Sequence, residues 1–195
     1  MMEGGMKAMG HRDGGQEIVE GGEQTKGITD DDAAPRLMTG IEQSSGHESQ
    51  QVYMEATQDG IRIQIVDTVE NPIFPPGGAQ LTDGGKKMLR SIAGILRNFP
   101  NDLAVEGHTD GSTVRSDQVS NWDLSAARAL FARRELESDG IDPSRIVRVV
   151  GNADKTPLMR ENLEAPRNRR ISILFIKGKK MKMPERLDWL IKPPT

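Results

Sequence analysis

The sequence lacks cysteine, long apolar runs and a basic net charge. With no cysteine in 195 residues, disulfides, thiolate metal sites and cysteine nucleophiles are all excluded. A net charge of −3 gives no general basic field, so we expect no nucleic-acid partner. The apolar runs fall far short of the roughly 20 residues that a membrane helix needs, and the N-terminus lacks the apolar core of a signal peptide. We therefore expect neither a membrane span nor an export signal in the chain as written.

Composition divides the chain into three parts. Residues 1–50 contain 4 Lys/Arg against 10 Asp/Glu, and 10 of the 21 glycines. They show no sustained period of 2 or 3.6, so they cannot bury enough apolar area to offset the loss of chain entropy on ordering. We expect a flexible, acidic, Gly-rich segment at 1–50, a folded domain at 51–178 and a basic tail at 179–195.

Strand and helix patterns alternate through the predicted domain. Residues 60–65 alternate apolar and polar side chains, as a half-buried strand does. Apolar residues at helical spacing follow a capping residue at 82 or 83 and again at 120. This pattern predicts an α/β (α+β) sandwich in the order βαβαββ, with the helices on one face of a mixed sheet. The expected elements are strands at 60–65, 103–106, 145–150 and 170–177, and helices at 83–99 and 120–138.

Asp110 and Arg128 are the two residues that we expect to carry the function. Asp110 follows the second predicted strand at its end. Arg128 lies four residues after Leu124, at the border of the buried face of the second helix, so its stem can pack while its guanidinium reaches the rim of the sheet. Taken alone, each residue is more often a turn aspartate or a solvated helix charge. Their motif context favours a binding role.

Other polar and aromatic residues favour structural roles. His108 could suggest acid–base or metal chemistry, but the other two histidines lie in the segment expected to be flexible. We therefore predict a strand-end structural role for His108, and a packing role rather than a ligand platform for Trp122. Arg169 and Arg170 alternate in direction along a strand, so at most one of them faces the site. No catalytic residue, metal site or cofactor is predicted.

Several motifs together carry a family resemblance. The motifs GHTD (107–110), LSAARA (124–129), VGNA (150–153) and NRR (168–170) resemble the OmpA-like peptidoglycan-binding domain. Within that family the sequences GIRIQIVD, SNWDLSAARA, RRELESDGID, RVVG and NRRISI are most similar to the branch formed by periplasmic domains of MotB, the stator subunit of the flagellar motor. The resemblance covers residues 52–177, roughly two thirds of the chain.

The resemblance implies a binding site for the diaminopimelate residue of the peptidoglycan stem peptide. Asp110 takes the ammonium of that residue, and Arg128 takes the carboxylate on the same carbon, because its planar fork donates two parallel hydrogen bonds. Thr109 helps to orient the acid. The supporting positions are Asn168, Arg169, Leu124 and Ser125.

The resemblance also implies a motor role. We expect a non-enzymatic module that anchors a stator to the cell wall on the periplasmic side of the inner membrane, as a homodimer. A MotB-like subunit begins with a membrane helix that carries the ion, and nothing before Val52 fits such a helix. We therefore expect a truncated form, with a MotA-like channel partner only where a membrane helix is present.

Two alternatives stay open from the sequence. One is an OmpA-like wall-binding protein with no motor role. The other is an envelope hydrolase that uses His108 and Asp110, which is disfavoured because the chain has neither GxSxG nor HExxH.

Overall fold

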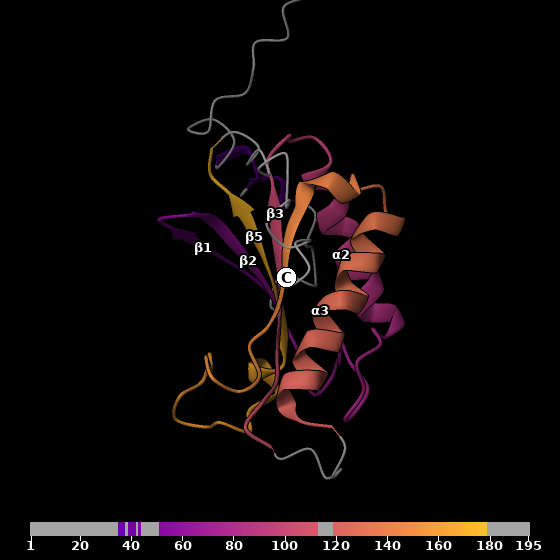
Figure 1. Ribbon diagram of the computed structural model, residues 1–195. Helices are drawn as coiled ribbons and strands as arrows, with labels where there is room; N and C mark the ends of the chain where they lie inside the picture. Colours follow the sequence, from indigo (N-terminus) through magenta and orange to yellow (C-terminus); the bar gives the residue numbers. More distant parts are fainter. Residues whose placement is uncertain (1–34, 38, 42, 44–50, 113–118, 179–195) are drawn as a thin grey trace, which may run out of the picture.

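Figure 1 shows the computed structural model, which describes residues 35–37, 39–41, 43, 51–112 and 119–178. Strands and helices alternate after an initial hairpin. In chain order the elements are β1 (Val52–Thr57), β2 (Gly60–Val66), α2 (Asp83–Leu96), β3 (Leu103–His108), α3 (Asn121–Ser138), the 3-10 turn η2 (Pro143–Arg145), β4 (Ile146–Gly151), the 3-10 turn η3 (Pro166–Asn168) and β5 (Arg170–Ile176).

The described strands form one mixed sheet in the order β1-β2-β5-β3-β4. Strands β3 and β4 are parallel, and the other neighbours are antiparallel. Both α2 and α3 lie on one face of the sheet, as Figure 1 shows. The predicted sandwich is therefore confirmed, with one strand more than expected. That strand, β1, forms a tight hairpin with β2, in which Gly60 adopts a φ of 143°, a backbone conformation that favours glycine.

The core lies between the sheet and the two helices. Alternate strand residues enter it, as their period of 2 predicts, and α2 contributes one apolar stripe. Two residues of the segment 1–50, Leu37 and Ile41, are 0% and 1% exposed within this core. The rest of that segment and the predicted tail lie mostly outside the described residues, so the division into segments stays a prediction. Core members from the sheet and α2 include Ile61, Ile63, Ile65, Met88, Leu89, Ile92, Leu96, Leu103, Val105, Ile171, Ile173 and Phe175.

Helix α3 packs unusually close to the ends of β3 and β4. A side chain at Gly107 would place its Cβ 2.1 Å from the carbonyl oxygen of Ser125, and one at Gly151 would lie 2.5 Å from the amide nitrogen of Ala126. Small residues therefore make the contact, and α3 buries Ala129 and Ala132. Helical spacing predicts a buried face formed by Leu124, Ala127, Phe131 and Leu136. Leu124 and Leu136 are buried, but Ala127 and Phe131 are only half-buried. This close approach places the first turns of α3 at the end of the sheet.

The N-terminus of α3 is fixed by the predicted capping box. The Ser120 hydroxyl accepts a hydrogen bond from the Asp123 amide at 3.2 Å, and the Asp123 carboxylate accepts one from the Ser120 amide at 2.9 Å. These bonds satisfy amides that the helix leaves unpaired, so the residues that follow are held in place. Among the described residues, none of the helices is both long and apolar enough to cross a membrane.

Candidate functional site

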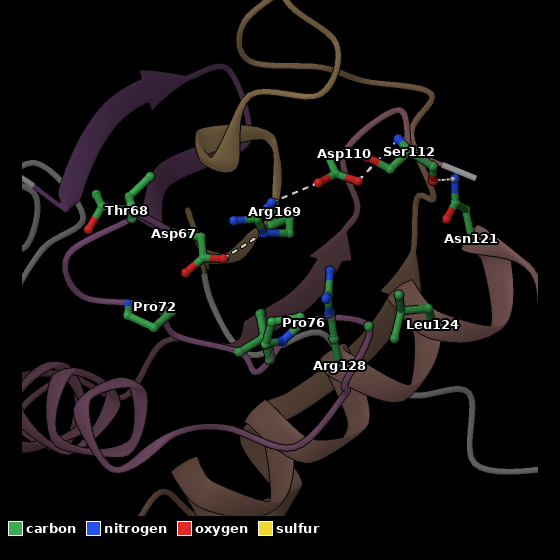
Figure 2. Close-up of a pocket in the computed structure, with 13 residues that line it drawn as sticks. Asp67, Thr68, Pro72, Pro76, Asp110, Ser112, Asn121, Leu124, Arg128 and Arg169 are labelled. Carbon is green, nitrogen blue, oxygen red and sulfur yellow. Dashed lines mark hydrogen bonds and ion pairs between the residues drawn. The ribbon is translucent and has the colours of Figure 1, made fainter. Parts of the chain in front are cut away.

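A pocket of about 510 Å³ opens at the end of the sheet where β2 and β3 end and β5 begins. Its walls come from four places: Asp67 and the loop that follows it before α2 (residues 68–81, the wall loop), the turn after β3, the first turns of α3, and Arg169 just before β5. Two aspartates and two arginines line it, and most of the remaining lining is apolar. The lining residues are Asp67, Thr68, Val69, Pro72, Phe74, Pro76, Gly77, Asp110, Ser112, Asn121, Leu124, Arg128 and Arg169, most of which Figure 2 labels.

Arg128 is a buried cation that borders the pocket. Only 1% of the residue is exposed, its Nε donates to the Gly78 carbonyl at 3.0 Å, and its Nη1 donates to the His108 carbonyl at 3.3 Å. The Phe74 ring lies beneath it, with 4.4 Å between the guanidinium carbon and the ring centre. Burial lowers the pKa of Arg128 to about 10, which the charge of Asp67 partly opposes, so the side chain remains protonated at neutral pH. None of the ion pairs among the described residues includes it.

Asp110 lies in the same pocket, as the sequence predicts, but its direct partner is Arg169. Its Oδ2 accepts a hydrogen bond from Arg169 Nη1 at 2.8 Å, and its Oδ1 accepts one from the Ser112 amide at 3.2 Å. Figure 2 shows this chain of contacts and the Arg128 guanidinium rising from α3 toward it. A carboxylate has more acceptor positions than these two bonds use. Asp110 can therefore accept a further donor from a ligand.

Asp67 is the site residue that sequence reasoning missed. Its side chain is 1% exposed, its Oδ2 accepts from Arg169 Nε at 2.6 Å, and its Oδ1 accepts from the Ile73 amide at 2.6 Å. Burial raises the pKa of Asp67, and the hydrogen bond from Arg169 opposes that rise. A signal was present in the sequence, because Asp67 ends the GIRIQIVD strand just as Asp110 follows the next one.

Arg169 connects the two aspartates. Strand β5 lies between β2 and β3 in the sheet, so the residue before it stands between Asp67 and Asp110. Burial lowers the pKa of Arg169, but hydrogen bonds to the two carboxylates overcome this effect, and the pKa lies above its ordinary value. Arg170 faces away and donates to Gln64 at 2.8 Å. As the alternation predicts, one arginine of the pair reaches the site.

Of the predicted supporting residues, Leu124 and Arg169 line the pocket, whereas Ser125 and Asn168 do not. Thr109, which was predicted to orient the acid, does not line it either. Ser125 is fully buried, donates to the Trp122 carbonyl at 3.0 Å and accepts from the Ala153 amide at 2.9 Å. The Thr109 amide donates to the Ala153 carbonyl at 2.9 Å. The structure thus places Ser125 and Thr109 where they fix the strand ends to α3, behind the pocket.

Asn168 holds the loop between β4 and β5 (residues 152–168, the brace loop). Its side-chain oxygen accepts from the Met159 amide at 2.8 Å, and its side-chain nitrogen donates to the Asn162 and Leu163 carbonyls at 3.0 and 2.9 Å. The Leu163 carbonyl also accepts from the Gly111 amide at 2.7 Å. Asn168 therefore supports the turn that carries Asp110 without lining the pocket.

His108 has the structural role that the sequence favours. The residue is 1% exposed, its Nδ1 lies 3.1 Å from the Thr156 hydroxyl, and its Nε2 lies 3.4 Å from the Ser172 hydroxyl. Burial, together with the charges of Arg170 and Arg62, lowers the pKa of His108 to about 3. By contrast, the prediction that Trp122 anchors packing is wrong, since 54% of it is exposed. In the described ranges, no cluster of three or more His, Cys, Asp or Glu residues could hold a metal ion.

Comparison with known proteins agrees with the fold and the motifs. A family model described as "OmpA family" matches residues 73–170, just over half of the chain. The chain belongs to the OmpA family. Motility protein B of Escherichia coli K12 is 39% identical over 125 residues, which cover 63% of this chain and 41% of that protein. The chain thus spans about two fifths of the length of that curated relative.

Solved structures show the same fold. The cell wall anchor of the T6SS from Pseudomonas aeruginosa superposes with a TM-score of 0.60 at 26% identity, over 74% of this chain and 99% of that one. The periplasmic domain of Helicobacter pylori MotB (residues 78–256) superposes with a TM-score of 0.56 over 65% of this chain and 82% of that one. At 20% identity, the second likeness concerns the fold alone.

Proposed function

We propose that this chain is a non-catalytic module that binds peptidoglycan by holding the diaminopimelate residue of a stem peptide in the pocket. The observation that carries the proposal is Arg128, a buried cation that borders an open pocket and has no carboxylate at ion-pair distance among the described residues. A buried charge is unfavourable unless a counter-charge approaches it. A ligand carboxylate supplies that counter-charge.

The pocket matches a zwitterion on an aliphatic stem. The free end of diaminopimelate carries an ammonium and a carboxylate on one carbon. Arg128 takes the carboxylate through donors that the two carbonyl contacts leave unused, and Asp110 takes the ammonium. Two aspartates and two arginines balance in charge, which suits a ligand without net charge. The methylene groups of the ligand contact the apolar wall, formed by Val69, Pro72, Phe74, Pro76 and Leu124.

We further propose that the module anchors a flagellar stator to the wall on the periplasmic side of the inner membrane. The 39% identity to motility protein B supports this role. Torque on a rotor acts equally on its stator, which must therefore be fixed. Two sites on a homodimer gain avidity for a polymer that repeats its ligand, and a MotA-like channel is the proposed partner.

A wall anchor without a motor role is the second candidate, favoured by the likeness to the T6SS cell wall anchor. The two candidates differ in their membrane partner. When the chain is fused to a MotB membrane helix, the stator proposal predicts association with a MotA-like channel in a co-purification experiment. Wall binding with no such association would favour the second candidate.

The hydrolase alternative is not supported by the geometry. Its candidate base, His108, does not line the pocket and bonds instead to Thr156 and Ser172 on the other face of the sheet. Incubation of the chain with purified sacculi should release no soluble fragments, whereas released muropeptides would contradict the non-catalytic assignment.

A pull-down on diaminopimelate-type sacculi tests the proposal. Wild type should sediment with the sacculi, and Asp110→Ala and Arg128→Ala should stay in the supernatant. Arg145→Ala is the matched control, because Arg145 is also a buried arginine bound to two carbonyls, Leu96 at 3.0 Å and Asn101 at 2.8 Å, but lies outside the pocket. Circular dichroism verifies that each variant is folded. Binding by both site variants, or none by wild type, would refute the proposal.

A further inference from the structure

The two poles of the pocket, Arg128 and Asp110, come from different elements. Arg128 belongs to α3, whereas Asp110 follows β3. In the part of the chain that the structure describes, no hydrogen bond or ion pair joins these two side chains. A ligand that carries both charges on one carbon nevertheless requires a fixed distance between its two partners. Another residue must maintain that distance.

One set of contacts leads from Asp67 to Asp110. The Oδ2 atom of Asp67 lies 2.6 Å from Arg169 Nε, and Arg169 Nη1 lies 2.8 Å from Asp110 Oδ2. The backbone amide of Asp67 also donates to the Arg169 carbonyl at 2.9 Å. Figure 2 shows the three side chains in a row along the upper wall of the pocket. The orientation of Arg169 against Asp110 therefore depends on Asp67.

A second set of contacts leads from Asp67 to Arg128. The Oδ1 atom of Asp67 accepts a hydrogen bond from the Ile73 amide at 2.6 Å. This bond fixes the wall loop at Ile73, the residue before Phe74. The Phe74 ring supports the Arg128 guanidinium at 4.4 Å, and further along the same loop the Gly78 carbonyl accepts from Arg128 Nε at 3.0 Å. The orientation of Arg128 therefore depends on the same carboxylate through its other oxygen.

We propose that Asp67 is a positioning residue that couples the two poles, with one carboxylate oxygen fixing Arg169 and Asp110 and the other fixing the wall loop and Arg128. Its side chain is 1% exposed, so both carboxylate oxygens contact protein groups rather than solvent. The role of the coupling in ligand binding rests on the function proposed above. The coupling itself is a property of the free protein and can be measured without ligand.

Two substitutions separate the two branches. Asp67→Asn keeps one acceptor oxygen for the Ile73 amide but presents an NH2 group to Arg169 Nε, so it breaks only the branch to Asp110. Phe74→Leu removes the ring beneath Arg128 and leaves the contacts between Asp67, Arg169 and Asp110 intact. Asp67→Ala breaks both branches. If Asp67→Ala does not fold, the other two variants still test each branch alone.

The experiment measures exchange of the arginine Nε–H protons with water, by nitrogen-15 NMR on the free protein. Asp67→Asn should speed exchange at Arg169 Nε about tenfold or more and leave exchange at Arg128 Nε unchanged. Phe74→Leu should speed exchange at Arg128 Nε and leave exchange at Arg169 Nε unchanged. Asp67→Ala should speed exchange at both. The control Asp142→Asn alters another aspartate that accepts a backbone amide, that of Ser144 at 2.8 Å, and should change neither. Wild-type exchange at either arginine in Asp67→Ala would overturn the coupling.

Binding of a diaminopimelate-containing muropeptide is measured on the same samples. Asp67→Asn and Phe74→Leu should each weaken binding about tenfold, and Asp67→Ala should weaken it more than either. If wild type binds and Asp67→Ala binds equally well, the positioning role is wrong while the proposed function stands. If wild type does not bind, the proposed function is wrong, and the exchange data still decide whether Asp67 couples the two arginines.

Discussion

The two faces of the sheet bury polar groups in opposite ways at the end of β3. On the helix face, the pocket places Arg128 beside open volume with two carbonyl contacts. On the other face lies a polar cluster whose members bond to one another, formed by Gln64, His108, Thr156, Arg170 and Ser172. There Arg170 donates to Gln64 at 2.8 Å, to the Thr156 carbonyl at 2.8 Å and to the Asn168 carbonyl at 3.2 Å. All three nitrogens of its guanidinium are therefore bonded within the protein.

The difference separates the proposed binding site from a structural polar network. Both arginines are almost fully buried, and burial lowers the pKa of each to about 10. Burial and a shifted pKa alone therefore do not distinguish Arg128, the arginine proposed to bind ligand, from Arg170. Unused hydrogen-bonding capacity next to open volume does, since only that can be exchanged for contacts with a ligand.

The largest expected effect is on stability and distinguishes the two arginines. Arg170→Met should lower the free energy of unfolding by about 3 kcal/mol, because it leaves a buried hydrogen-bond network without its donor. Arg128→Met should lower it by only about 1 kcal/mol, because the open pocket beside Arg128 gives water access to the carbonyls that lose their donor. Urea denaturation followed by circular dichroism measures both values. Equal losses would contradict the contrast between the two faces.

A smaller effect should appear in the pH dependence of stability. His108 in the polar cluster has a pKa of about 3 when folded, against about 6.5 when unfolded. Below pH 6.5 the unfolded chain therefore binds a proton that the folded chain excludes, and stability falls as the pH falls toward 3. From pH 6 to pH 5 this group should remove about 1 kcal/mol.

The variant His108→Gln isolates that contribution. Urea denaturation at pH 6 and pH 5 should show a shallower loss of stability in the variant than in wild type. Above pH 7.5, where the histidine is neutral in both states, the two proteins should have the same pH slope. Identical slopes below pH 6 as well would mean that His108 is not held neutral by the cluster.

The smallest expected effect concerns the surface beside the pocket. Trp122 is 54% exposed, so Trp122→Ala should change the free energy of unfolding by no more than about 0.5 kcal/mol. The same denaturation experiment measures this change. A loss of 2 kcal/mol or more would restore the packing role that the sequence suggested.

Much of this architecture is predictable from the sequence, because periodicity reports which side of a strand or helix is buried. The strand at 60–65, both long helices and the inward side of Ile171, Ile173 and Phe175 are confirmed. Strand β1 was missed because its burial is uneven along its length. It is recognised only through its pairing with β2.

The sequence predicts which residues belong to the site better than it predicts which of them contact one another. Asp110 and Arg128 line one pocket, as predicted, because Asp110 follows the end of β3 and Arg128 lies on the buried side of α3 near that end of the sheet. Their roles in binding remain predictions. The contacts of Asp67 and Arg169 could not be read from spacing, since the residues are 102 positions apart and meet only because β5 lies between β2 and β3.

The most direct test of the central claim compares two ligands that differ at the group assigned to Arg128. Lysine-type stem peptides lack the distal carboxylate of diaminopimelate but keep the ammonium. Isothermal titration calorimetry should show that wild type binds a diaminopimelate-type muropeptide about tenfold or more tightly than its lysine counterpart, and that Arg128→Met loses this preference. Equal affinity of wild type for both muropeptides would contradict the assignment of Arg128 to the ligand carboxylate.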